Sequence, residues 1–155
     1  MTPIDSFSGE HRFLSNFWPV TIAMPLQWAL PLEVKLGQDQ YASVEHAYQA
    51  CKSLDAKDRL WVRWAPTAGK AKQRAQKVTL RDDWESIKLD VMWDMLVVKF
   101  DYPEMRSKLL STGSAELIEG NTWNDTFWGV CRGVGQNYLG RLLMDIRAGH
   151  RLRRT

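Results

Sequence analysis

The stretch DDWESIKLDVMWDMLVVKF, residues 82–100, decides the fold class of this chain. Apolar residues recur through it at the three- and four-residue spacing of one helix face: Trp84, Ile87, Val91, Met95 and Val98. Asp82 or Asp83 can cap its N-terminus. The sequence therefore predicts a long helix with one apolar stripe.

Helical periodicity also precedes this stretch. Ser43 is a predicted N-cap, and the segment around it carries an apolar stripe of Tyr41, Val44, Ala47, Tyr48 and Cys51. Further on, Pro103 can open a short helix that runs to about Leu110 and stops near Gly113. The last predicted helix starts near Asn137 and ends at Gly149, with an inner face of Leu139, Leu142, Leu143 and Ile146.

The first part of the chain has a different pattern. Between residues 13 and 40, prolines and a glycine separate short apolar runs such as VTIAM and LEVKL. These runs favour two or three short strands joined by turns. The predicted class is α+β, mainly α, as a single domain over residues 1–155 with a small β element near the N-terminus.

Composition excludes several classes of protein. The chain has 155 residues, 45% hydrophobic and 25% charged, which is typical of one soluble domain. No apolar run approaches the ~20 residues of a membrane span, and the N-terminus does not have the pattern of a secretory signal. With 3 histidines and only Cys51 and Cys131 as cysteines, we expect a reduced cytoplasmic protein without a structural metal.

Charge and aromatic content give two further expectations. The formal net charge is +3, and removing Arg151, Arg153 and Arg154 leaves a neutral body. The excess charge therefore predicts a basic tail at residues 150–155 and not a nucleic-acid-binding face. The chain also has 8 tryptophans, of which some could stack on a flat ligand.

One polar group lies within SVEHAYQACK, residues 43–52. Glu45, Gln49 and Lys52 share a helix face, with roughly 10 Å along the axis between the first and the last. That separation leaves room for a sugar. The face is either a solvated helix surface or the working side of an active site. His46 is expected at the surface or in the cap.

A second polar group lies within residues 124–140. Asp125 precedes Trp128, an arrangement that can hold a base or a sugar, and glycines such as Gly135 precede Asn137 at a predicted helix start. Free N–H groups there could bind phosphate. The alternative is an ordinary glycine loop with Asn137 as N-cap.

Taken together, these pieces resemble the NADAR, or YbiA-like, family. The resemblance covers nearly the whole chain and is carried by FLSNF (13–17), SVEHAYQACK (43–52), DWESIK (83–88), KF (99–100), LLSTG (109–113), LIE (117–119), NDTFWG (124–129) and GQNYLGRLLMDIR (135–147). It implies a single mainly helical α+β domain that hydrolyses N-glycosidic bonds without a cofactor. Two substrate classes are implied: phosphoribosylamino-pyrimidine intermediates of riboflavin biosynthesis, and ADP-ribose on guanine in nucleic acid.

The resemblance also implies which residues form the site. The hypothesis assigns Lys52 as the nucleophile, Glu45 as the proton shuttle and Asp125 as the group that positions the sugar hydroxyls; attack by water assisted by Glu45 stays open. The expected substrate-binding residues are Asn16, Phe17, Arg74, Trp84, Lys99, Trp128, Gly135 and Asn137. Among these, Trp128 and Trp84 would stack on the base, and the helix start at 135–137 would bind phosphate with Arg74 or Lys99. The alternative function is a non-catalytic module that binds ADP-ribose or another nucleotide.

Overall fold

The computed structural model describes residues 1–153, so Arg154 of the predicted tail lies outside the described residues. The backbone forms two compact units, and each is described by itself. The first joins Met1–Ser15 to the chain from Phe100 onward, and the second is Asn16–Lys99. Helices dominate both units and the strands are short, which confirms the mainly helical α+β class.

The second unit begins with a small antiparallel ladder. Strand β1 (Ile22–Ala23) pairs with β2 (Gln40–Tyr41). Helix α1 (Pro31–Lys35) lies between them in the sequence, so the expected strand over LEVKL is wrong. Pro31 suits the first helical turn, and the Glu33 carboxylate accepts a hydrogen bond from the Leu30 N–H at 2.8 Å, so the cap favours a helix.

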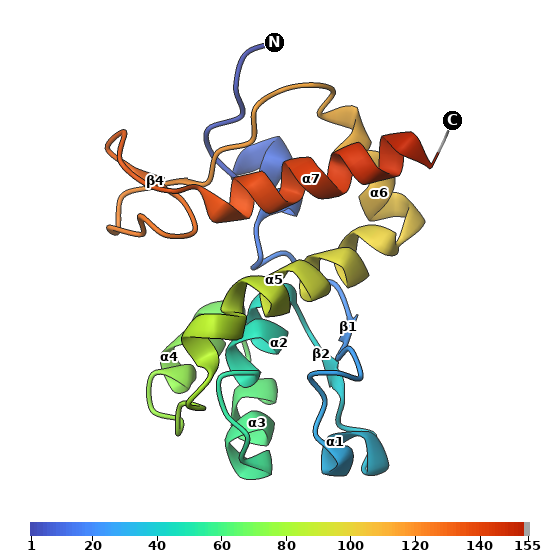
Figure 1. Cartoon of the computed structure of the whole chain (residues 1–155), viewed down its shortest axis with the longest axis vertical. Coiled ribbons are helices and arrows are strands. Elements are labelled where there is room, and N and C mark those ends of the chain that lie inside the picture. The colour runs from blue at the N-terminus through green and yellow to red at the C-terminus, as the bar shows by residue number, and fades with distance from the viewer. Residues whose placement is uncertain (154–155) are drawn as a thin grey trace. The chain divides into compact units, whose positions relative to one another are not determined.

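Three helices of this unit pack together: α2 (Val44–Ala50), α3 (Ala56–Arg63) and α4 (Ala68–Ala75). Figure 1 shows them gathered in green beside the start of α5 (Trp84–Asp101). In α5 the predicted face is buried at Trp84, Val91 and Met95 and half-buried at its other two positions. The long helix predicted from the sequence is confirmed.

The cap of α2 is confirmed, and of the two alternatives expected for His46 the capping one holds. The Ser43 hydroxyl accepts a hydrogen bond from the His46 N–H at 3.1 Å. The His46 ring lies within 2.7 Å of the same hydroxyl and donates from Nε2 to the Ala65 carbonyl at 3.0 Å. His46 therefore takes part in the cap, yet it is buried and not at the surface, because α3 and α4 cover this side of α2.

The first unit contains a 3-10 helix η1 (Gly9–Leu14), α6 (Pro103–Ser111) and α7 (Tyr138–Leu152), with α6 packed against both of the others. Strands β3 (Gly120–Asn121) and β4 (Val130–Cys131) pair in parallel. Helix α6 and the turn at Gly113, whose φ is +63°, match the prediction. No helix within residues 1–153 is long and apolar enough to cross a membrane.

The predicted end of the last helix at Gly149 is wrong. Helix α7 continues to Leu152, so the predicted tail at 150–155 begins inside a helix. His150 is buried, and its contacts within the first unit extend the packed face of α7 by one turn. Gly149 is exposed and lies inside α7, so it does not end the helix.

Candidate active site

The polar face of α2 is buried. Glu45 is 6% exposed and Gln49 is 4% exposed, because α3 and α4 both pack against α2. The alternative of a solvated helix surface is therefore wrong. A buried carboxylate and a buried amide on neighbouring helix turns need hydrogen-bond partners, and the structure supplies only some of them.

The hydrogen bonds around Glu45 leave two acceptors unused. Gln49 donates from Nε2 to Glu45 Oε1 at 2.8 Å, and the Glu45 N–H donates to the Asn16 carbonyl at 3.0 Å. The side chain of Asn16 directs its Nδ2 at Met92 Sδ, 3.5 Å away. Asn16 Oδ1 and Gln49 Oε1 are buried and accept no hydrogen bond from any described residue. Two free acceptors on residues that both hydrogen-bond to Glu45 suit a ligand rich in hydroxyl or amino donors.

Lys52 lies in the turn that follows α2. The helix ends at Ala50 with Cys51 as its C-cap, so the continuous helical spacing predicted from Glu45 to Lys52 is wrong. Lys52 Nζ lies 5.9 Å from the centroids of both the Tyr48 and Trp84 rings. Those two rings are 5.1 Å apart and tilted by 57°. The ammonium group is thus placed against two aromatic faces.

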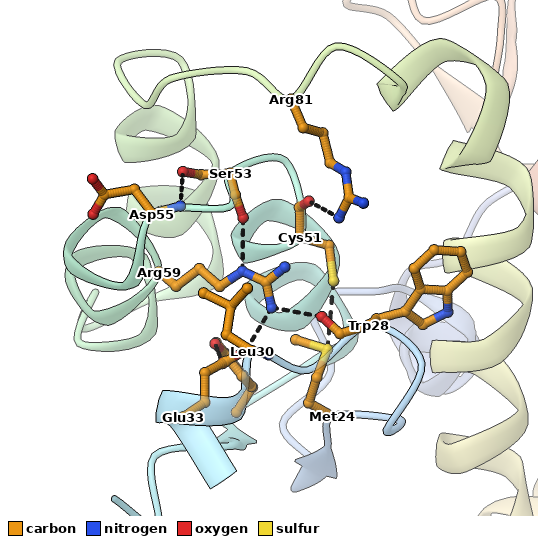
Figure 2. Close-up of polar contacts among 10 residues, drawn as sticks. Met24, Trp28, Leu30, Glu33, Cys51, Ser53, Asp55, Arg59 and Arg81 are labelled. Carbon is orange, nitrogen blue, oxygen red and sulfur yellow. Dashed lines mark hydrogen bonds and ion pairs between the residues drawn. The ribbon is translucent and has the colours of Figure 1, made fainter. Parts of the chain in front are cut away.

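Two arginines fix the backbone of this turn (Figure 2). Arg59 donates from Nε to the Ser53 carbonyl at 2.7 Å, and its Nη1 donates to the Trp28 carbonyl and to the Glu33 carboxylate. Arg81 donates from its backbone N–H to the Lys52 carbonyl at 2.8 Å and from Nη1 to the Cys51 carbonyl at 3.5 Å. The carbonyls of residues 51–53 therefore all have donors, which hold the Lys52 backbone in place.

The pKa of Lys52 is lowered. The largest cause is burial, which disfavours the charged amine, and the positive charges of Lys72 and Lys88 act in the same direction. Glu45 and Glu85 oppose these effects and raise the pKa, with Glu45 the stronger of the two. More of the neutral, nucleophilic amine is therefore present near neutral pH than for an exposed lysine.

The Trp84 ring packs beside the lysine. Its side chain is 4% exposed and lies beside Lys52 and Tyr48, and the expected stacking on a base stays a prediction. Tyr48 was missed as a site residue. Its position four residues before Lys52 was a usable signal, but its place in an apolar stripe pointed to the core instead.

The other residues predicted in this unit are dispersed. Lys99 is fully buried at 0% exposure, and burial lowers its pKa to about 7. Its role in phosphate binding stays a prediction. Arg74 lies over the Trp61 ring, 5.4 Å from the centroid. Phe17 is 45% exposed, and its ring would lie 3.9 Å from a Cβ placed on Gly69.

In the first unit, Asp125 shapes its own loop. Its Oδ1 accepts hydrogen bonds from the N–H groups of Phe127 at 3.2 Å and Trp128 at 2.9 Å. The Asn121 side chain accepts from the Asp125 N–H and donates to its carbonyl. Trp128 is half-buried and meets the Phe127 ring edge to face at 4.8 Å. These contacts account for the Asp-x-x-Trp spacing structurally.

The N–H groups at the start of α7 are hydrogen-bonded within the chain, and phosphate binding there stays a prediction. The N–H groups of residues 136–139 donate to the carbonyls of residues 126–129, at 2.8 to 3.2 Å. The Asn137 side chain accepts from the Glu119 N–H and donates to the Leu117 carbonyl, so it makes no cap hydrogen bond. Gly135 has φ +153°, and a Cβ there would lie 2.1 Å from the Gly129 carbonyl oxygen. The glycine spacing therefore serves a close backbone contact.

The predicted site residues belong to both units. Asn16, Glu45, Lys52 and Trp84 belong to the second unit, and the residues of the 125–137 segment belong to the first. Residues 1–153 contain no cluster of three His, Cys, Asp or Glu side chains placed to hold a metal ion.

The fold and the group around Lys52 define a small, mainly helical α+β protein in which a buried carboxylate influences the pKa of a half-buried lysine. This chain belongs to the NADAR family, since the NADAR domain matches residues 6–152.

Two named relatives extend this result. The Escherichia coli protein "N-glycosidase YbiA" is 36% identical over 148 residues, which cover 92% of this chain and 83% of the relative. The maize protein "Riboflavin biosynthesis protein PYRR, chloroplastic" is also 36% identical over 148 residues, covering 86% of this chain. This chain matches only 22% of the maize protein's length.

A solved structure shares the fold over almost the full length. The NMR structure of the E. coli protein YbiA aligns with a TM-score of 0.79 at 32% sequence identity, and the alignment covers 99% of this chain and 87% of that one. The family and the fold class predicted from the sequence motifs are both confirmed.

Proposed function

We propose that this chain is an N-glycosidase that hydrolyses the C1′–N bond of a ribosylated base. The proposal is supported by membership of a family whose relatives are named N-glycosidases. The observation that carries it is the combination of a half-buried Lys52 of lowered pKa with the buried Glu45 carboxylate. A non-catalytic binding module would need neither an amine of lowered pKa nor a carboxylate that influences that pKa.

In the proposed mechanism, the neutral Lys52 amine attacks C1′ of the ribose. The new N–C1′ bond forms as the bond to the base breaks, and the departing nitrogen takes up a proton that Glu45 relays. Opening of the sugar ring gives an imine with Lys52, and water then releases the sugar and restores the amine. Glu45 is suited to the relay because it is close enough to raise the Lys52 pKa.

The unused acceptors explain how the sugar would be held. Asn16 Oδ1 and Gln49 Oε1 each need a donor, and ribose hydroxyls are donors of the right kind. Binding such a ligand would remove the cost of leaving buried amide oxygens unsatisfied. Asp125 and Trp128 stay predictions, since their observed contacts are accounted for by the loop they shape.

The favoured substrate class is the phosphoribosylamino-pyrimidine intermediates of riboflavin biosynthesis. The name of the maize relative supports this choice, although this chain spans only a minor part of that protein. Cleavage of ADP-ribosyl-guanine stays the alternative substrate class. A cytoplasmic location also stays part of the proposal; Cys51 and Cys131 are both free, which fits a reducing compartment.

The test is reductive trapping of the imine. Borohydride added during turnover of a phosphoribosylamino-pyrimidine should fix the sugar fragment to Lys52, located by peptide mass spectrometry, while ribose 5-phosphate release reports activity. Lys52→Ala and Lys52→Arg should both lose the adduct, because guanidinium is a poor nucleophile. The matched control is Lys72→Arg, which keeps an exposed positive charge near Lys52 and should still be trapped.

Two outcomes would overturn parts of this proposal. The pKa of Lys99 is about 7, so this lysine also has a neutral amine near neutral pH. If the adduct maps to Lys99, the assignment of Lys52 as the nucleophile is wrong. If an active preparation gives no adduct on any lysine, attack by water assisted by Glu45 replaces the covalent route. Absence of sugar release from either substrate class would refute the glycosidase itself.

A further inference from the structure

Without its tail arginines the protein has no net charge, but its basic residues are concentrated in one segment of the sequence. Every charged residue between Asp58 and Asp82 is basic. This segment contains the end of α3 and all of α4, so the positive charge is concentrated on two packed helices of the second unit. A body with no net charge therefore still carries a locally basic surface.

The side chains of these helices form two series, one on each helix. Lys57, Trp61 and Trp64 follow one another on α3 and its C-cap at intervals of four and three residues, which places them on one face. Lys70, Arg74 and Lys77 do the same along α4 and its end. The opposite face of α4 is buried through its alanines. We call the six residues Lys57, Trp61, Trp64, Lys70, Arg74 and Lys77 the α3–α4 stripe.

The two tryptophans of the stripe are exposed and held in place. Trp61 is 41% exposed and Trp64 is 68% exposed, which is unusual for such large apolar side chains. The Arg74 guanidinium lies 5.4 Å from the Trp61 centroid while it donates to the Trp61 carbonyl at 2.7 Å. Arg63 lies 5.5 Å from the Trp64 centroid and donates to the Gln40 carbonyl at 2.7 Å. The Arg74 contact joins the α3 and α4 series, and each arginine orients one of the two rings.

The cations of the stripe are not neutralised by carboxylates. Within residues 1–153, none of its lysines or Arg74 makes an ion pair. The nearest acidic residues in sequence are engaged elsewhere. Asp55 caps α3 through its backbone N–H groups, and Asp58 accepts from the Ser53 hydroxyl and the Thr79 N–H. The stripe therefore presents positive charge together with flat aromatic rings.

We propose that the α3–α4 stripe binds single-stranded nucleic acid. Exposed tryptophans stack on unpaired bases, and lysines or arginines beside them neutralise the phosphate backbone. A duplex hides the faces of its bases, and an acidic peptide has carboxylates but no regular series of flat rings. The observations therefore favour a single strand. This binding does not depend on the glycosidase activity, and a binding assay tests it without turnover.

The experiment measures fluorescence anisotropy of a labelled single-stranded oligonucleotide of mixed sequence, titrated with the full chain at several salt concentrations. Trp64→Ala should weaken binding roughly 5- to 150-fold, the range for loss of one stacked base, while Trp64→Phe should retain most of it. Lys70→Gln with Lys77→Gln should lower the slope of log affinity against log salt by about 1.4, since each phosphate contact contributes about 0.7.

Matched controls come from the same chain. Trp123→Ala removes another tryptophan that is 60% exposed, and Lys35→Gln removes an exposed lysine outside the stripe. Neither should change the affinity, and all variants should keep the wild-type thermal midpoint. Equal effects of Trp123→Ala and Trp64→Ala would overturn the proposal. So would equal affinity for a duplex of the same length, or for polyglutamate, because either result would leave the exposed rings without a role.

Discussion

The fully buried Lys99 makes a quantitative prediction about pH. Its pKa in the folded protein is about 7, lowered by burial from an ordinary value of 10.5. Between these two values the unfolded chain keeps a proton that the folded chain releases. The unfolded state therefore binds more protons, and the free energy of unfolding rises with pH in this window. Below about pH 7 both states are protonated and this dependence disappears.

The magnitude follows from the same two pKa values. Each pH unit inside the window contributes about 1.4 kcal/mol, so stability should rise by about 2.5 kcal/mol from pH 6 to pH 9 on account of Lys99 alone. Replacing Lys99 by Met removes the titrating group and keeps a long apolar stem. The difference in unfolding free energy between the wild type and Lys99→Met should therefore change by about 2.5 kcal/mol across this range.

Urea unfolding followed by tryptophan fluorescence measures this difference at pH 6, 7, 8 and 9. Subtracting the variant from the wild type cancels the titration of all other groups. Lys35→Met is the matched control, because Lys35 is exposed, and its difference from the wild type should not vary with pH. Parallel pH profiles for the wild type and Lys99→Met would refute the lowered pKa of Lys99.

Three further predictions concern the candidate site and the end of the chain. Glu45→Gln should keep the fold, reduce turnover at least ~10²-fold and move the lysine limb of the pH–rate profile to lower pH, since Glu45 raises the Lys52 pKa. Arg59→Met should cost about 3–5 kcal/mol in urea unfolding, because it leaves Glu33 buried without its ion pair; Arg59→Met with Glu33→Gln should recover part of the loss. Truncation before His150 should lower the thermal midpoint more than truncation after Leu152, because His150 is buried.

The sequence predicts long helices well and short elements poorly. The stripe from Trp84 to Val98 repeats over several turns, so its period is unambiguous. The run LEVKL is too short to distinguish a strand from a helix by period. There the local chemistry decides, since Pro31 opens the turn and Glu33 caps it. At the chain end, Gly149 looked like a stop signal, but packing of His150 extends the helix.

For the candidate site, the sequence identifies residues but not their surroundings. The helical period places Glu45 and Gln49 on a face of their own, yet it cannot tell whether water or protein covers that face. The cover comes from α3 and α4, which lie further along the chain. The sequence also singles out Asp125 and Asn137 without showing what their side chains contact. The Asp125 carboxylate accepts a hydrogen bond from the Trp128 N–H within its own loop, whereas the Asn137 side chain binds the backbone of Leu117 and Glu119, which are distant in sequence.

The protonation of Lys52 depends on this nonlocal environment. On an ideal helix Glu45 would be two turns away from Lys52 and would raise its pKa only weakly. In the structure Glu45 is the largest influence that raises the Lys52 pKa. Burial still exceeds that influence, so the net pKa is lowered. The same carboxylate that would relay a proton therefore also holds Lys52 partly charged. An N-glycosidase that uses both groups must release that proton before attack, and the pH–rate profile of Glu45→Gln separates this electrostatic effect from the relay.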